Sequence, residues 1–283
     1  MFAPLTLDAL TARYDALLLD AYGVLVTLDG PLPGAVALID RLNRLGKPYW
    51  LLSNTAARLP EHAAARYRGF GLELEAGRIL TAGMLLTQHF REQGLVGRAC
   101  LVLGPEDSRV YVERAGGRPV APGDDFEAVV LADQAGFPLL ETLDWLISTL
   151  FAKIEGGAHV PLILPNPDLI YPTHQGYGLT AGSLAVLLEA VLARRFPDRA
   201  DLRFVPLGKP QPGLFEMAAQ LAGSRNLVML GDQMETDILG AARFGIDSVL
   251  VMSGVSRGEA VSPAAGVQPT DRIESLAVLL KNA

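Results

Sequence analysis

Short apolar runs alternate with longer amphipathic stretches along most of the chain. The runs are of strand length, whereas the stretches between them repeat apolar residues at helical spacing. The predicted strands are residues 16–19, 49–52, 99–103, 128–131, 161–164, 227–230 and 248–251. The predicted helices are residues 34–45, 60–70, 82–93, 108–115, 138–151, 183–194, 212–222 and 237–244. This alternation predicts an α/β fold, with a Rossmann-like, three-layer core in which helices cover a parallel sheet.

The polar residues that could carry chemistry gather in two blocks, one before residue 60 and one after residue 205. The middle of the chain has a strand–helix alternation of its own. We therefore expect a core formed by residues 1–95 and 185–283, with an inserted α/β cap domain at residues 96–184. The glycine- and proline-rich joints 94–97 and 171–182 would be its hinges. Such a cap can close a site and exclude water.

Composition narrows the class of protein. Lys and Arg total 24 against 31 for Asp and Glu, and the net charge of -7 disfavours broad binding to nucleic acid or anionic membranes. The single Cys100 excludes an internal disulfide and a multi-cysteine zinc site. We see no secretory signal and no apolar run of membrane-spanning length. We therefore expect a cytoplasmic protein whose partner is a small molecule.

Asp20 directly follows the apolar run 16–19 and precedes a turn at Gly23. A carboxylate in this place lies at the carboxyl end of a buried parallel strand, which is where open α/β sheets bind ligands. It can attack phosphorus or carbon and form a covalent intermediate. For this segment alone, a helix-capping or turn aspartate is the alternative.

Two further segments supply groups that a phosphoryl-accepting Asp20 would need. Ser53 and Asn54 follow the second strand, where a hydroxyl can donate to a phosphate oxygen ahead of a helix whose N-terminal amides attract anions. Lys209 follows a glycine, and its ammonium can neutralise charge on the nucleophile and on the transferring group. In isolation, Ser53 could equally be a plain N-cap and Lys209 a solvated surface lysine.

Asp232 follows the apolar run 227–230 and a glycine, and Asp237 lies five residues further on. Asp20 and Asp232, from adjacent strand ends, offer the oxygen ligands that Mg²⁺ prefers, with Asp237 in support. Three carboxylates and Lys209 leave a charge near -2, which would repel a phosphate dianion unless a divalent cation is bound. Asp237 is also a good N-cap for the next helix, which is the structural alternative.

In this order, the four segments resemble the haloacid dehalogenase-like hydrolase superfamily over almost the whole chain. The insert between the Ser53 and Lys209 segments is similar to the large α/β cap of the p-nitrophenyl-phosphatase and sugar-phosphatase subfamily. The stretches that match this subfamily are Pro165-Asn166-Pro167-Asp168, Gly208-Lys209-Pro210, and Gly231-Asp232 to Asp237-Ile238 followed by Val251-Met252-Ser253-Gly254-Val255.

The resemblance implies a phosphatase that acts on a small phosphorylated metabolite. Asp20 would be the nucleophile and form an aspartyl-phosphate. Ser53 and Asn54 would bind the phosphoryl group, and Lys209 would stabilise its charge.

The resemblance also implies a cofactor and an assembly. Mg²⁺ would be held by Asp20, the main-chain carbonyl of Tyr22 and Asp232, with Asp237 supporting them. Caps of this type often mediate dimers, which implies a homodimer through the cap.

The first motif departs from the family pattern at Tyr22. Phosphatases of the family usually have an aspartate there, which protonates the leaving alcohol and then activates water. A phenol with a pKa near 10 is a poor base at neutral pH, so we expect slow turnover except with good leaving groups. Asp29, Asp168 and His174 are candidates for a replacement acid–base, because their loops are expected to face the cleft.

Two other functions stay open. Asp-Ala-Tyr-Gly at residues 20–23 also resembles the first motif of the 2-haloacid dehalogenases, which need neither a second aspartate nor a metal. A catalytically weak protein that binds a phosphate ligand is the other alternative, and Tyr22 favours it. The intact pair Asp232 and Asp237 and the large cap count against dehalogenation, and the retained Asp20 counts against a pure binding protein.

Overall fold

The computed structural model describes residues 5–173, 176–254 and 266–281, and each predicted strand is present in it. The strands are β1 (Ala16–Leu19), β2 (Tyr49–Ser53), β3 (Ile79–Thr81), β4 (Ala99–Leu103), β5 (Arg118–Val120), β6 (Ala128–Leu131), β7 (Leu162–Leu164), β8 (Ile170–Thr173), β9 (Gly176–Leu179), β10 (Val205–Pro206), β11 (Leu227–Gly231), β12 (Asp247–Val251) and β13 (Asp271–Ile273). The helices are α1 (Leu7–Arg13), α2 (Ala35–Leu45), α3 (Pro60–Gly69), α4 (Leu86–Glu92), α5 (Glu106–Arg114), α6 (Leu139–Glu155), α7 (Ala181–Arg195), α8 (Gly213–Ala222) and α9 (Leu239–Phe244).

A six-stranded parallel sheet has the strand order β13-β12-β11-β1-β2-β3. The strands β2 and β3 lie on one side of β1, and the later strands β11, β12 and β13 lie on its other side. The strand order therefore reverses between β1 and β11, and the crevice at their carboxyl ends is where ligands bind in such sheets. The predicted α/β class and parallel sheet are confirmed.

The buried strand β1 shows why its sequence is a continuous apolar run. Leu17 and Leu19 pack with Leu38 of α2 on one face of the sheet, whereas Leu18 packs with Phe215 of α8 on the other. Because helices cover both faces, side chains pointing either way are buried, and no polar alternation is needed.

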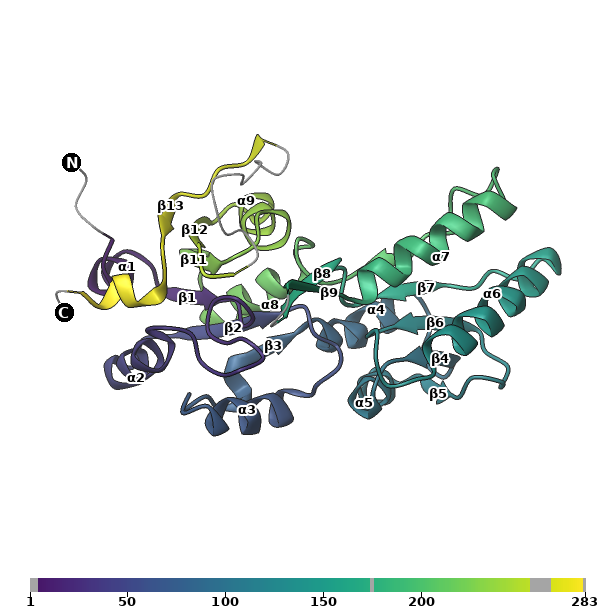
Figure 1. Cartoon of the computed structure of the whole chain (residues 1–283), viewed down its shortest axis with the longest axis horizontal. Coiled ribbons are helices and arrows are strands. Elements are labelled where there is room, and N and C mark those ends of the chain that lie inside the picture. Colours follow the sequence, from purple (N-terminus) through teal and green to yellow (C-terminus); the bar gives the residue numbers. More distant parts are fainter. Residues whose placement is uncertain (1–4, 174–175, 255–265, 282–283) are drawn as a thin grey trace.

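A second, five-stranded parallel sheet has the order β10-β7-β6-β4-β5. One face packs with Leu146 of α6 and Leu188 of α7, and the other with Phe90 of α4 and Val112 of α5. Figure 1 shows the two sheets toward opposite ends of the long axis. The strand β10 belongs to this second sheet and α7 packs on it, so both elements are part of the second unit. The predicted boundary between residues 184 and 185 therefore falls inside α7. The domain division itself stays a prediction.

Within the stretch predicted as a hinge, residues 171–173 and 176–179 belong to an antiparallel hairpin of β8 and β9, and residues 181–182 begin α7. The hairpin lies between the two sheets in Figure 1. Pro172 and the glycines of this stretch hide the strand pattern in the sequence, because they are poor strand residues.

Other differences from the prediction involve short or polar elements. The strands β3, β10 and β13 are two or three residues long and lack a distinct apolar run. The helix predicted at residues 82–93 is split into a 3₁₀ turn (Ala82–Leu85) and α4. The helix predicted to begin at Asp237 starts earlier, with a π-helical turn (Met234–Ile238) that continues into α9.

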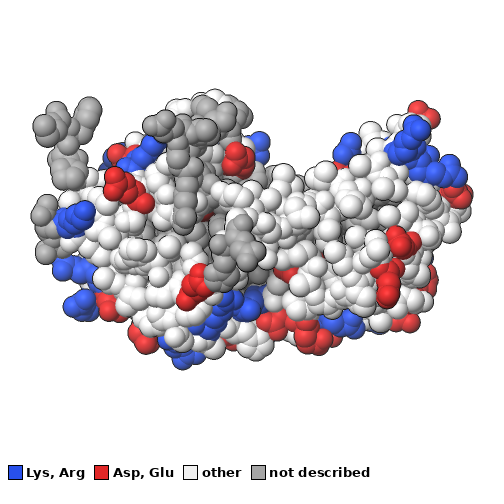
Figure 2. All heavy atoms as spheres, viewed as in Figure 1, with Lys and Arg blue, Asp and Glu red and all other residues white. Residues whose placement is uncertain are grey.

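The surface matches the modest net charge. On the face drawn in Figure 2, acidic and basic side chains are interspersed rather than gathered into one field of a single sign. Within the described residues, no helix has both the length and the apolar character that crossing a membrane requires.

Candidate active site

Three predicted site residues lie at the carboxyl ends of neighbouring strands. Asp20 follows β1, Ser53 ends β2 and Asp232 follows β11. Leu19 is in register with Leu51 of β2 and with Leu230 of β11, so the three strands end at nearly the same level. The parallel pairing therefore brings together residues that are more than two hundred positions apart in the sequence.

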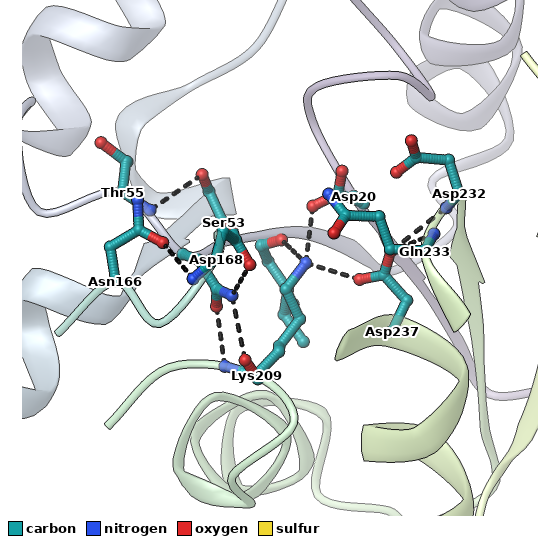
Figure 3. A network of polar contacts seen from close by, with 11 residues as sticks. Asp20, Ser53, Thr55, Asn166, Asp168, Lys209, Asp232, Gln233 and Asp237 are labelled. Atoms are coloured by element: carbon teal, nitrogen blue, oxygen red, sulfur yellow. Dashed lines mark hydrogen bonds and ion pairs between the residues drawn. The ribbon is translucent and has the colours of Figure 1, made fainter. Parts of the chain in front are cut away.

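Lys209 connects the carboxylates of this site. Its Nζ donates to Asp20 Oδ1 at 2.5 Å, to Asp237 Oδ1 at 2.6 Å and to the carbonyl oxygen of Leu52 at 2.9 Å (Figure 3). The side chain is only 2% exposed. Burial alone would lower the pKa of this ammonium, but Asp20 and Asp237 raise it above its ordinary value. Lys209 therefore stays charged, with all three of its donors in use.

Asp20 is subject to opposing influences. Its burial raises the pKa of the carboxyl group to about 7, with Lys209 acting in the opposite direction and Asp237 adding to the rise. The ionised form, which a nucleophile requires, therefore depends on positive charge nearby.

Asp237 shapes the loop that carries Asp232. Its Oδ2 accepts the backbone N–H groups of Asp232 at 3.1 Å and Gln233 at 3.2 Å. It lies inside the π-helical turn and is almost fully buried, so the alternative of a simple N-cap is wrong. One carboxylate thus fixes both the ammonium of Lys209 and the backbone at Asp232.

The acidic residues fit a hard divalent cation. Asp20, Asp232 and Asp237 are buried and each offers an oxygen within 4.8 Å of the others. Two glycines leave the room for Asp232, because an added Cβ would lie 2.3 Å from its Oδ2 at Gly23 and 1.8 Å from it at Gly254. Oxygen-only ligands of this kind suit Mg²⁺ or Ca²⁺.

Asn54 holds the backbone of Lys209. Its Oδ1 accepts the Lys209 N–H at 2.7 Å, and its Nδ2 donates to the Lys209 carbonyl at 3.0 Å and to Asp168 Oδ1 at 2.8 Å. The Asn54 side chain therefore positions its neighbours, and its assignment to phosphate binding stays a prediction. Ser53 Oγ accepts the Thr55 N–H at 3.3 Å and faces the site cavity. The helix α3 begins only at Pro60, so Ser53 is not its N-cap.

A cavity of about 310 Å³ lies over these groups. Residues of the core and of the second unit line it together, and from the second unit these are Asp133, Gln134, Asn166, Asp168, Ile170, Tyr171 and Thr180. Its size is at the lower end of small-molecule sites.

Tyr22 also lines this cavity. Burial raises the pKa of its phenol against the opposing charges of Arg66 and Arg58. The phenol is therefore protonated at neutral pH and can donate a hydrogen bond, but it cannot replace a carboxylate as a base.

The three candidates for a replacement acid–base differ in position. Asp168 lines the cavity, and burial raises the pKa of its carboxyl group to about 6, with Lys209 and Asn54 opposing. Asp29 is exposed and is not among the residues that line the cavity. His174 lies outside the described residues.

Sequence reasoning missed several residues of the cavity wall, in particular Arg58, Arg66 and Asp133. The two arginines lie within a polar stretch that leads into and along α3. Their spacing is that of ordinary solvated helix charges, so the sequence alone carries no signal that they face a cavity.

Two family models match the chain. One, described as haloacid dehalogenase-like hydrolase, matches residues 17–118, which include Asp20 and Ser53. The other, described as HAD-hydrolase-like, matches residues 206–279, which include Lys209 and Asp232. Human chronophin is 33% identical over 266 residues, which cover 87% of this chain and 84% of chronophin. The chain belongs to the haloacid dehalogenase-like hydrolases.

Two other relatives cover almost the full length. Dihydroxyacetone phosphatase of Corynebacterium glutamicum is 29% identical over 264 residues, or 93% of this chain and 89% of the relative. A solved structure described as a possible sugar phosphatase of the HAD superfamily, from Cytophaga hutchinsonii, is 29% identical. It superposes with a TM-score of 0.84 over 98% of this chain and 99% of its own. The resemblance predicted from the motifs is therefore confirmed for the core and the second unit together.

Proposed function

We propose that this haloacid dehalogenase-like hydrolase is a Mg²⁺-dependent phosphatase that acts on a small phosphorylated metabolite. One observation carries the proposal: the Asp20 carboxylate, ion-paired with the buried Lys209, forms an acidic cluster with Asp232 and Asp237 below a small cavity where the strand order of the sheet reverses. Two of the relatives described above are named as a phosphatase and a possible sugar phosphatase, which supports phosphate esters as the substrate class.

The chemistry proposed for the chain has two steps. In the first, an Asp20 carboxylate oxygen attacks phosphorus, the ester P–O bond breaks, and the alcohol leaves after taking a proton from solvent. In the second, water attacks the aspartyl-phosphate, inorganic phosphate leaves and the carboxylate is restored. Lys209 offsets negative charge on Asp20 and on the transferring phosphoryl group. The Ser53 hydroxyl faces the cavity, where it would donate to a phosphoryl oxygen.

Asp20, the main-chain carbonyl of Tyr22 and Asp232 would hold Mg²⁺. Asp237 would support these ligands indirectly, because its two oxygens bind Lys209 and the backbone N–H of Asp232. When bound, the ion supplies the positive charge that lets a phosphate dianion approach three carboxylates.

Tyr22 limits the range of substrates. No carboxylic acid stands two residues after Asp20, so an alkoxide leaving group has no acid from this position. We therefore propose that aryl and acyl phosphates are turned over faster than alkyl phosphates. The missing acid costs about 10²- to 10⁴-fold for alkyl esters.

Assembly and cell compartment are also proposals. A homodimer through the second unit is supported by apolar side chains that this unit exposes, among them Leu169, Leu179 and Val186. Size-exclusion chromatography with light scattering tests the dimer. A reducing cytoplasm is supported by the single, buried Cys100.

The test of the function is hydrolysis of p-nitrophenyl phosphate and acetyl phosphate, with Mg²⁺ and with a chelator, by the parent chain and by Asp20→Asn. We expect metal-dependent turnover that disappears in a folded Asp20→Asn variant. Activity that persists in this variant would exclude Asp20 as the nucleophile. If neither ester is hydrolysed, turnover of chloroacetate without metal would identify a dehalogenase, and no turnover would identify a binding protein.

A further inference from the structure

The cavity above Asp20 reaches two arginines that the proposed reaction does not use. Arg58 lies in the loop after β2 and Arg66 on α3, and both are half-buried in the cavity wall beside Tyr22. Lys209, together with the Mg²⁺ proposed to bind at the three carboxylates, already accounts for the charge of one phosphoryl group. The additional guanidinium groups therefore need another explanation.

A neutral aromatic ring holds Arg66, which leaves the charge of its guanidinium available. The Arg66 Cζ lies 5.4 Å from the ring centroid of Phe70, a cation–π contact that positions the guanidinium without neutralising it. Both arginines line the same cavity as Tyr22, and their charges lower the pKa of its phenol against the effect of burial. Among the described residues, neither guanidinium forms an ion pair with a carboxylate.

The second unit fixes the backbone around Arg58. The Tyr111 hydroxyl, on α5, donates to the Arg58 carbonyl at 2.8 Å. The next backbone N–H, of Leu59, donates to Asp107 Oδ2 at 2.8 Å. A fixed backbone at Arg58 limits where its side chain can reach, so less backbone order has to be gained when a ligand binds.

We infer that Arg58 and Arg66 form a second anion-binding subsite, so that the preferred substrates carry a carboxylate or a second phosphate besides the reacting phosphoryl group. This inference rests on the proposed function for the reacting group. Planar guanidinium groups suit both anions, because they donate two parallel hydrogen bonds to carboxylate or phosphate oxygens.

The two arginines contribute unequally. Asp133 lines the same cavity, and Arg58 acts against the rise that burial causes in the pKa of that carboxyl group. Part of the Arg58 field is thus offset by Asp133. Arg66, whose close contacts are an aromatic ring and a phenol, keeps more of its charge for a ligand.

The first experiment compares charged and neutral substrates that share one ring. The probes are 4-carboxyphenyl phosphate, 1,4-phenylene bisphosphate and the neutral methyl ester of the first. We expect Arg66→Gln to reduce the ratio of kcat/KM for the carboxylate over that for the ester by about tenfold or more, and Arg58→Gln by less. Arg66→Lys should restore part of the ratio. Arg68→Gln, on the exposed face of α3, is the matched control and should leave the ratio unchanged.

The bisphosphate distinguishes the two anions, because the subsite prefers whichever probe loses more in Arg66→Gln. An unchanged ratio for both anionic probes in both glutamine variants would overturn the inference.

The second experiment does not depend on turnover and separates this inference from the proposed function. Calorimetry measures binding of 4-carboxybenzyl phosphonate and of its methyl ester to the parent chain and to Arg66→Gln. Tighter binding of the carboxylate to the parent, lost in Arg66→Gln, supports the subsite even if no ester is hydrolysed. Equal binding of both phosphonates, or binding of neither, contradicts it.

Discussion

At the scale of single residues, the site is dominated by charges that depend on one another. Burial makes the Asp20 carboxylate costly, and the Lys209 ammonium recovers part of that cost through a 2.5 Å contact. Asp237 is the second anionic partner of the buried Lys209 ammonium. Changing any member leaves a buried charge without compensation, which is more damaging than the loss of one hydrogen bond.

Replacing Tyr22 tests the missing acid directly. Tyr22→Asp places a carboxyl group two residues after Asp20, where it can protonate an alcohol. We expect turnover of alkyl phosphates to rise by about tenfold to a hundredfold, measured by phosphate release. Tyr22→Asn, of similar size but without a titrating proton, is the control. Equal rates for the Asp and Asn variants would show that proton transfer is not what the site lacks.

Asp168 gives a pH-dependent contribution to stability. Burial raises its pKa from 3.8 to about 6, so the folded state binds the proton more tightly than the unfolded state does. This contribution is fully present below about pH 4 and is lost as the pH rises through about 6. Asp168→Asn, which keeps an acceptor for Asn54, should therefore gain about 3 kcal/mol in unfolding free energy relative to the parent between pH 4 and pH 8.

Urea unfolding at several pH values measures that difference. Asp201 provides a control of opposite sign, because its hydrogen bond with Arg199 lowers its pKa to about 2. Asp201→Asn should lose stability relative to the parent as the pH rises from about 2 to about 4, and the difference should stay constant above that. A difference for Asp168→Asn that does not change with pH would contradict the assignment.

At the scale of elements, strand ends and the turns after them set the geometry. The carboxyl ends of β1, β2 and β11 supply Asp20, Ser53 and Asp232, and each strand continues into a turn rather than directly into a regular α-helix. The π-helical turn after β11 points Asp237 back at the strand end. Extra turns of this kind are frequent at functional sites, because they redirect one side chain without breaking the helix.

Gly254 tests the room that these turns leave for a cation. An added Cβ would lie 1.8 Å from Asp232 Oδ2, so Gly254→Ala must displace that carboxylate. We expect the affinity for Mg²⁺ to fall at least about tenfold, as measured by calorimetry. Gly77→Ala is the matched control, since no atom lies within 4 Å of a Cβ added there. An unchanged affinity in a folded Gly254→Ala variant would place the cation away from Asp232.

At the scale of the whole molecule, Asn54 ties together the two units of the chain. It hydrogen-bonds Lys209 of the returning segment and Asp168 next to the β8–β9 hairpin, which are 155 and 114 residues away in sequence. Asn54, Asp168 and Lys209 all line the cavity, whose wall is formed by residues of both units. The stability of the cavity therefore depends on both units of the chain rather than on either sheet alone.

Truncating the Asn54 side chain should lower the stability of the whole fold. Asn54→Ala leaves the Lys209 N–H and carbonyl and the Asp168 carboxyl group without their partner, and we expect unfolding free energy to fall by about 2–4 kcal/mol. Asn43→Ala is the control, because the Asn43 side chain makes two hydrogen bonds, with the Glu73 carbonyl and the Tyr49 hydroxyl, but within the core and nearer to solvent. Equal losses in both variants, measured by urea unfolding, would show that Asn54 has no special role in joining the units.

The sequence by itself determined which strands are followed by the residues that can carry chemistry. Buried parallel strands need unbroken apolar runs, so β1, β2 and β11 and the polar residues after them are visible in one dimension. Tertiary structure alone decided which partners those residues have. Lys209 between Asp20 and Asp237, Asn54 against Lys209, and the two arginines in the cavity wall all depend on segments that are distant in sequence. Side-chain direction is set by packing against such segments, and hydrophobic periodicity carries no record of it.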